Sequence, residues 1–308
     1  MTQPITTESL TFQQIHIDAA RNSTDDFNLF HDPRKWGRIR DNPFGGPITL
    51  GFQLECLIED QLRLYRAEHN EVALIEANGL RFSNYQFTFA SVVRPGETVQ
   101  VEIKKSLLKP GDNTTLSNRV VLKGARGIAL FGIKRESQAP LFLSDVDLST
   151  LPDLSHQPDR SYLDDAGLFY KRKFMSTGNT KNFLSGSLAD QSAYFDELEE
   201  RVSFPDMYPA ALISCALLER ARHNHHDFEN EPMVYTSHAI SIDRELARGL
   251  RSNDVLHLLV NEPVALITPD AESVTQYRHH CFGLLHTGAV LFRAEITMMP
   301  LAAILKSM

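Results

Sequence analysis

A short stretch near the amino end of the chain gathers side chains that can handle protons. Asp26, Asn28 and His31 stand in the order Asp-Phe-Asn-Leu-Phe-His. A carboxylate and an imidazole on one ordered loop can hold a single water molecule between them and move its proton. The pattern alone is a weak indication, because Asp and Asn are frequent in turns and helix caps for structural reasons.

An apolar segment that could complete such a site follows the loop. Residues Ile48 to Leu62 have helical spacing and are apolar on most faces, as in a helix buried inside a curved sheet. Gly51, near its start, would let a ligand approach the backbone closely. The first amides of a helix carry partial positive charge and can bind an oxyanion. We therefore expect the loop and the helix start to act together.

The elements that position this segment occur twice. Four segments of the first half match the second half in the same order, at offsets of 157 to 161 residues. Cys56 in the apolar helical run corresponds to Cys215 in a second such run, Tyr208 to Ala221. Four matches in order indicate an internal duplication rather than chance.

Each half has the same expected order of elements, which is an irregular entry, one apolar helix and a series of strands. The expected strands cover residues 79–93, 98–107, 114–123 and 127–135 in the first half, and 235–243, 255–260, 274–284 and 288–298 in the second. Alternating apolar residues and many β-branched side chains favour strands there. The pattern predicts an α+β fold with one sheet around one helix, twice.

The chain length allows two domains. A stretch rich in Pro, Ser and Asp separates the halves and is typical of a linker. We expect an N-terminal domain over residues 1–138, a linker over 139–165 and a C-terminal domain over 166–308.

The segment from Asp26 to Gly51 resembles the MaoC-like hydratases, which are R-specific enoyl thioester hydratases and dehydratases. Their signature is Asp, any residue, Asn, two residues and His, followed by an apolar helix that begins with glycine. The run Phe87 to Val99, with its Arg-Pro-Gly-Glu-Thr turn, is similar to a later strand and turn of that family. The resemblance covers the first half, reaches the second by repetition, and implies a tandem double hotdog fold.

The resemblance also implies roles for four residues. Asp26 would act as the base, His31 would position the water and share protons, the Gly51 amide would lie in the oxyanion hole, and Asn28 would hold the loop or ligand. Two positions depart from the family pattern. Leu29 replaces the usual Pro, which affects loop stiffness, and Leu50 replaces the usual His before the glycine, which affects the substrate.

The second half does not repeat the Asp and His pair. The residues that align with Asp26, depending on the gap, are Ser185, Gly186 or Ser187, and those that align with His31 are Asp190, Gln191 or Ser192. The second half is thus a degenerate copy. We expect one active site in the first half, completed by the second.

Composition disfavours several other classes of protein. The net charge is −8 with no basic stripe, which argues against a nucleic-acid partner. Cys56, Cys215 and Cys281 lie far apart in apolar runs, as buried small residues do, and do not suggest disulfides or zinc. The histidine clusters at 223–226 and 279–280 lack the spacing of metal ligands. We see no signal peptide or membrane span and expect a cytoplasmic protein.

Several functions fit these observations. The leading expectation is a lyase of fatty acid or polyketide metabolism that hydrates or dehydrates enoyl or 3-hydroxyacyl groups on CoA or acyl carrier protein, without a cofactor. A hotdog thioesterase or acyltransferase on acyl thioesters remains open, as does a non-catalytic acyl-binding protein. The chain could be a monomer or a homodimer.

Overall fold

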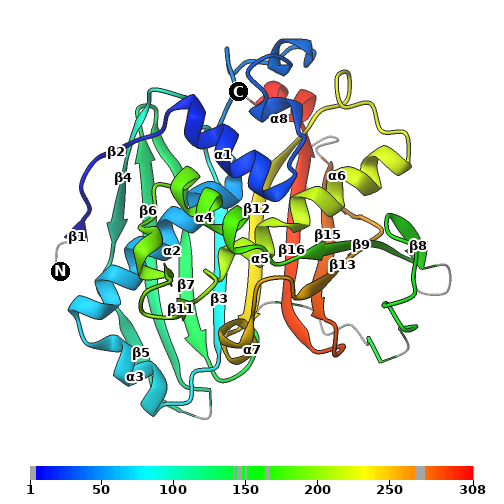
Figure 1. The fold of residues 1–308 in the computed structure, drawn as a ribbon. Coiled ribbons are helices and arrows are strands. Elements are labelled where there is room, and N and C mark those ends of the chain that lie inside the picture. Colours follow the sequence, from blue (N-terminus) through cyan, green and yellow to red (C-terminus); the bar gives the residue numbers. More distant parts are fainter. Residues whose placement is uncertain are drawn as a thin grey trace.

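One long antiparallel sheet runs through the whole molecule (Figure 1). The computed structural model describes residues 5–111, 113–141, 143, 148–149, 151–163, 167–267 and 275–307. Along the sheet the strands follow the order β1-β4-β6-β7-β3-β12-β16-β15-β13-β9-β8. The central pair, β3 and β12, comes from different halves of the chain, so the two repeats share a single sheet.

The first repeat contributes three helices and seven strands over its described residues. The helices are α1 (Gln14–Thr24), α2 (Gly51–Glu68) and α3 (Glu71–Ala77), with the 3-10 turns η1 (Leu29–His31) and η2 (Trp36–Arg38) between the first two. The strands are β1 (Ile5–Thr6), β2 (Leu10–Thr11), β3 (Phe82–Phe89), β4 (Thr98–Ile103), β5 (Leu107–Lys109), β6 (Thr115–Gly124) and β7 (Gly127–Ser137).

The second repeat follows the same order with additions at its edges. Its helices are α4 (Thr177–Gly186), α5 (Met207–Ala211), α6 (Ile213–His223), α7 (Arg244–Gly249) and α8 (Leu301–Ser307), with the 3-10 turn η3 (Gln191–Ala193). Its strands in the main sheet are β8 (Ser161–Leu163), β9 (Leu168–Phe174), β12 (Met233–Asp243), β13 (Val255–Asn261), β14 (Val264–Ile267), β15 (Thr275–Leu285) and β16 (Val290–Pro300). A separate small hairpin joins β10 (Phe195–Asp196) and β11 (Arg201–Val202).

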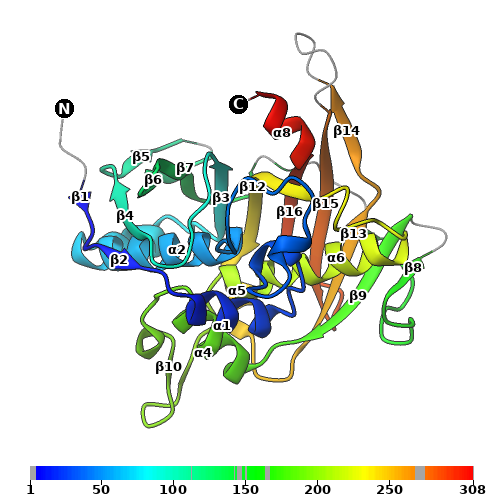
Figure 2. The same cartoon turned by 90° about the horizontal axis from the view of Figure 1, so that it is seen from above.

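The molecule has three layers (Figure 2). The sheet forms one side, α2 and the pair α5–α6 lie in a row against it, and α1 and α4 lie outside that row. Helices α1 and α4 pack so closely that a Cβ at Gly186 would lie 2.7 Å from the carbonyl oxygen of His16. Apolar side chains of the sheet and of the central helices form one continuous core.

The duplication inferred from the sequence is visible in matching turns. Before β4, the Glu97 carboxylate accepts a hydrogen bond from the Arg94 amide at 3.0 Å. Before β13, the Asp254 carboxylate accepts one from the Arg251 amide at 2.6 Å. These residues belong to one of the matched segments, so the same side-chain chemistry closes the same turn in both repeats.

Both apolar helical segments are helices, with two differences from the expectation. Helix α2 begins at Gly51 rather than at Ile48, because the backbone of Leu50 is extended, with ψ of 145°. The amides of Ile48 and Thr49 donate to the Phe30 and Val93 carbonyls and hold this extended segment in place. The second helix is divided at Leu212 into α5 and α6. Glu59 of α2 caps the start of α5 by accepting hydrogen bonds from two backbone amides, which ties the two central helices together.

Part of the expected linker packs on the second repeat. Leu154 and Leu163 are buried beside Tyr170 and Leu259, and β8 pairs with β9. The residues of 139–165 that lie outside the described part of the chain are 142, 144–147, 150 and 164–165. The domain limits inferred from the sequence stay a prediction.

Candidate functional site

The end of helix α1 determines where the Asp26 side chain lies. Asp25 adopts a left-handed backbone conformation with φ of 55°, and the Asp26 amide donates to the Arg21 carbonyl at 2.8 Å. This arrangement closes the helix end and turns the chain sharply. The Asp26 side chain is 4% exposed, and its Oδ1 accepts a hydrogen bond from the Asn28 amide at 2.9 Å.

Asn28 holds the loop in a second tight turn. Its side-chain oxygen accepts a hydrogen bond from the Phe30 amide at 3.2 Å and thereby caps η1. The predicted role of Asn28 was to hold the loop or the ligand, and the contact present in the structure is with the loop. The turn buries Phe30 and His31 behind it.

His31 connects this loop to the segment that leads into helix α2. Its Nδ1 lies 2.9 Å from the carbonyl oxygen of Ile48, and the Ile48 amide donates to the Phe30 carbonyl at 2.9 Å. A carbonyl only accepts, so Nδ1 carries the proton and Nε2 has a free lone pair. The imidazole, which is 5% exposed, is therefore held at Ile48, three residues before Gly51 in the chain.

The start of helix α2 offers amides without an acceptor. The side-chain oxygen of Gln53 accepts a hydrogen bond from the Leu50 amide at 3.2 Å. The amides of Gly51 and Phe52 have no acceptor among the described residues. The first amides of a helix point along its axis with no partner inside the helix. Amides in this position can stabilise a negatively charged oxygen.

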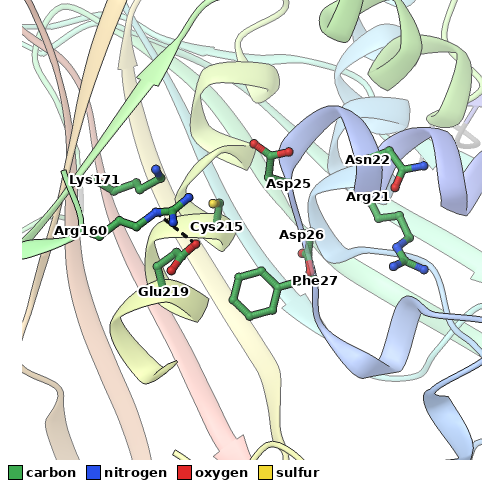
Figure 3. Close-up of a pocket in the computed structure, with 9 residues that line it drawn as sticks. All are labelled: Arg21, Asn22, Asp25, Asp26, Phe27, Arg160, Lys171, Cys215 and Glu219. Atoms are coloured by element: carbon green, nitrogen blue, oxygen red, sulfur yellow. Dashed lines mark ion pairs between the residues drawn. The ribbon is translucent and has the colours of Figure 1, made fainter. Parts of the chain in front are cut away.

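A cleft of about 400 Å³ lies between the α1 end and the second repeat (Figure 3). The first repeat lines one side, and residues before and within β9 and α6 line the other. Asp26 and Phe27 face Cys215 and Glu219 across it. The full lining is Arg21, Asn22, Asp25, Asp26, Phe27, Arg160, Lys171, Cys215 and Glu219.

The charges of this cleft are largely neutralised within the protein. The Arg160 guanidinium lies 3.4 Å from the Glu219 carboxylate, and the Lys171 ammonium donates to Asp159 at 2.7 Å. Burial raises the pKa of the Cys215 thiol to about 11, with nearby lysines opposing the shift. The thiol is therefore protonated near neutral pH, which disfavours a cysteine nucleophile here.

The structure brings only some of the predicted residues together. Asp26 lines the cleft, whereas Asn28, His31 and Gly51 are not among its lining residues. Although both side chains are buried, the described contacts include no hydrogen bond between them. The water-holding pair of Asp26 and His31 stays a prediction.

A buried pair beside Gly51 was missed by the sequence reasoning. His238 on β12 places Nδ1 3.0 and 3.1 Å from the two carboxylate oxygens of Glu55 on α2. Both side chains are 0% exposed. A Glu within an apolar helical run, with no Lys or Arg at i±3 or i±4, was the available signal. Such a buried carboxylate requires a partner from elsewhere in the fold.

Tyr235 contacts this pair and is close enough to Asp26 for their charges to interact. Its ring centroid is 4.8 Å from that of His238. Its hydroxyl lies 3.0 Å from the Ser214 hydroxyl of α6. Burial raises the pKa of Tyr235, and the Asp26 carboxylate raises it further. Asp26, Tyr235 and His238 therefore belong to one region that both repeats build.

The second repeat has a different set of residues at the equivalent turn. Asp190 caps η3 through the Ser192 amide as Asn28 caps η1. This places Ala193 at the position of His31, one residue beyond the alignments considered from the sequence. The Ala189 amide donates to the Leu184 carbonyl at the end of α4, as the Asp26 amide donates to the Arg21 carbonyl at the end of α1. Neither alanine can transfer a proton.

In the part of the chain that the structure describes, no group of three or more His, Cys, Asp or Glu side chains is arranged to hold a metal ion. None of its helices has the length and apolar character needed to cross a membrane. The three cysteines are free and buried, as expected.

Comparison with known proteins confirms the fold. No protein-family model matches the sequence, and no curated protein sequence matches it either. Among solved structures, a protein of Chloroflexus aurantiacus described as a MaoC-domain dehydratase matches with a TM-score of 0.62 and 11% identity, over 97% of this chain and 96% of its own. A conserved hypothetical protein of Mycobacterium tuberculosis, described as having a double hotdog fold, matches with a TM-score of 0.56 and 10% identity over 97% of both chains.

A third match is partial on the side of the known protein. Full-length peroxisomal multifunctional enzyme type 2 of Drosophila melanogaster matches 96% of this chain with 48% of its own, at a TM-score of 0.51 and 9% identity. The structural neighbours thus include MaoC-like dehydratases, and the chain has the α+β double hotdog fold. At this level of identity the likeness establishes the fold alone.

Proposed function

We propose that this protein catalyses the reversible hydration of 2-enoyl thioesters to 3-hydroxyacyl thioesters, presented on CoA or acyl carrier protein. The observation that carries the proposal is the hydrogen bond from His31 to the Ile48 carbonyl. It fixes the acid–base loop against the entry to α2, whose first amides have no acceptor among the described residues. The fold of MaoC-like dehydratases supports this reading.

The reaction requires three things of the protein. A water molecule must lose a proton as its oxygen adds to C3, and the Asp26 carboxylate is the proposed acceptor of that proton. His31 would hold the water through the lone pair on Nε2. The electron pair of the double bond moves onto the thioester oxygen, where the Gly51 amide would stabilise the charge. C2 must then take up a proton, and no metal or redox cofactor takes part.

A direct test is mass spectrometry of the protein incubated with a panel of 2-enoyl and saturated acyl thioesters. We expect enoyl substrates to gain the mass of one water. Asp26→Asn and His31→Ala should each lower the rate of that gain about 100-fold or more, which is the usual contribution of a positioned acid or base. Both variants should keep binding a saturated acyl thioester, because neither change removes the oxyanion amides.

Asp190→Asn is the matched control. It alters the residue that caps the equivalent turn of the second repeat, and Asn preserves the cap. The control should hydrate like the parent protein. If free acid and thiol appear instead of a hydrated product, the protein is a thioesterase on this fold. If no substrate changes but acyl thioesters bind, it is an acyl-binding protein, and either result rejects the hydratase proposal.

A further inference from the structure

His238 and Glu55 form a buried contact between the two repeats. Glu55 lies on the second turn of α2, and His238 lies on β12 opposite Phe87 of β3. Both side chains are fully buried, and the imidazole Nδ1 donates to the carboxylate. A carboxylate that holds Nδ1–H fixes the tautomer and directs a basic Nε2 away from itself.

The second nitrogen of His238 has no partner. Its Nε2 is a buried atom without a hydrogen-bond acceptor or donor in the described part of the chain. Aromatic rings surround the imidazole, with Phe52, Phe89 and Tyr235 at centroid distances of 4.6, 4.9 and 4.8 Å. Buried polar atoms are nearly always hydrogen-bonded, so an unpaired one requires an explanation, and contact with a bound ligand is one such explanation.

The imidazole also lies beside the first residue of α2. A Cβ built on Gly51 would lie 3.5 Å from His238 Cε1 and 2.8 Å from Phe89 Cζ. The space next to the Gly51 backbone is thus shared by the edge of His238 and the ring of Phe89. Phe89 is partly buried against the core, so a ligand group that reached this space would have to displace its ring.

We propose that His238, oriented by Glu55, is the residue that exchanges the proton at C2 of the acyl thioester. The inference rests on the proposed function, because it assumes a thioester oxygen on the Gly51 amide. It assigns the two proton transfers to different repeats, with Asp26 acting at the C3 oxygen and His238 at C2. The thioester would displace the Phe89 ring and thereby reach Nε2.

The proton balance of the dehydration direction is complete with these groups. Nε2 of His238 takes the proton from C2, and the C–H electron pair forms an enolate whose oxygen the Gly51 amide holds. The enolate then forms the C2–C3 double bond while the C3 hydroxyl leaves as water with a proton from Asp26 in its acid form. Hydration is the reverse, and both groups return to their starting states by exchange with solvent.

Exchange of the C2 protons for deuterium separates this step from hydration. Butanoyl-CoA, which has no double bond, is incubated with the protein in heavy water, and the mass gain at C2 is followed. The parent protein should exchange these protons, because the exchange needs no added water. The exchange rate of His238→Gln should be lower than that of the parent protein by about 100-fold or more. Glu55→Gln should show an intermediate loss, since the imidazole remains but loses its orienting partner.

His279→Gln is the matched control for loss of a buried histidine. His279 lies on β15, two strands from His238, and its imidazole contacts the Asn261 backbone carbonyl. It should exchange like the parent protein. If His238→Gln fails to fold, the double variant Glu55→Met with His238→Phe replaces the pair by apolar groups and leaves no buried charge unpaired. That variant should fold and lack exchange.

The outcomes distinguish this inference from the proposed function. If the parent protein hydrates 2-enoyl thioesters and the variants at position 238 hydrate and exchange equally fast, the role of His238 is wrong while the hydratase proposal stands. If the parent protein exchanges C2 protons but never adds water, and His238→Gln abolishes the exchange, the hydratase proposal is wrong and His238 keeps its role. Absence of both reactions overturns both.

Discussion

At the scale of single residues, the candidate site consists of side chains that lie near the start of α2. Asp26 and His31 were recognisable in the sequence because they are close together in the chain. Glu55 and His238 were not, because 183 residues separate them and each lies in an apolar segment. Sequence spacing reveals sites built on one loop, whereas a pair joined across a sheet and a helix appears only after folding.

Gly51 offers a test at this scale. In Gly51→Ala the new Cβ would meet Phe89 Cζ at 2.8 Å and His238 Cε1 at 3.5 Å. The Phe89 ring is able to shift, and Ala favours the helix over Gly by up to about 1 kcal/mol, so we expect little change in stability. Hydration should fall about 100-fold, since a displacement of about 1 Å in a site can have that effect.

The measurement compares thermal unfolding and hydration rates of Gly51→Ala with those of Gly46→Ala. A Cβ at Gly46 meets no atom within 4 Å, so this variant tests the loss of glycine without crowding. Full activity in Gly51→Ala would show that the substrate does not use the space beside that backbone.

At the scale of elements, alternation and apolar periodicity predicted most of the sheet. Strands β4, β6, β7 and β13 lie within or close to the expected ranges, because their buried and exposed residues alternate or are continuously apolar. Helices α1 and α4 were not foreseen. Both are short and mainly polar, and they cover the central helices with few buried side chains, so their periodicity is weak.

The contact between the end of α2 and strand β7 gives a prediction about pH. The carboxylate of Glu136 forms an ion pair with Arg66 and accepts a hydrogen bond from the Ser83 hydroxyl. Burial by itself would raise the pKa of Glu136, but the positive charges of Lys134 and Arg66 outweigh it and lower the pKa to about 2. An unfolded chain would protonate this group nearer 4.5.

The stability that Glu136 contributes is therefore present above pH 4.5 and is lost as the pH falls towards 2. The shift corresponds to about 3 kcal/mol at 1.36 kcal/mol per pKa unit. Glu136→Gln should lower the free energy of unfolding by about that amount at neutral pH and should flatten its acid dependence. Urea unfolding across this pH range checks both, and an equally steep acid loss in the variant would contradict the assignment.

At the scale of the whole molecule, the second repeat lines the candidate site although it does not repeat the Asp and His pair. It lines the cleft through Cys215 and Glu219, and it places His238 beside Gly51. Strands β3 and β12 pair along seven residue positions, from Ser237 opposite Thr88 to Asp243 opposite Phe82. In a tandem of two hotdog repeats, a strand and a helix of one copy can therefore lie beside a loop whose polar residues come from the other copy.

This arrangement predicts that the two repeats depend on each other. Residues 1–138 expressed alone would expose the edge of β3 and leave the buried Glu55 carboxylate without its partner, and both effects favour aggregation or unfolding. Residues 139–308 alone would expose β12 in the same way.

Produced together as two separate chains, the halves should copurify and recover hydration, because β3 and β12 can pair without a covalent link. The test measures copurification, the solubility of each half and the activity of the mixture. A soluble and fully active half of residues 1–138 would show that the second repeat contributes nothing to the reaction, and would reject the assignment of His238.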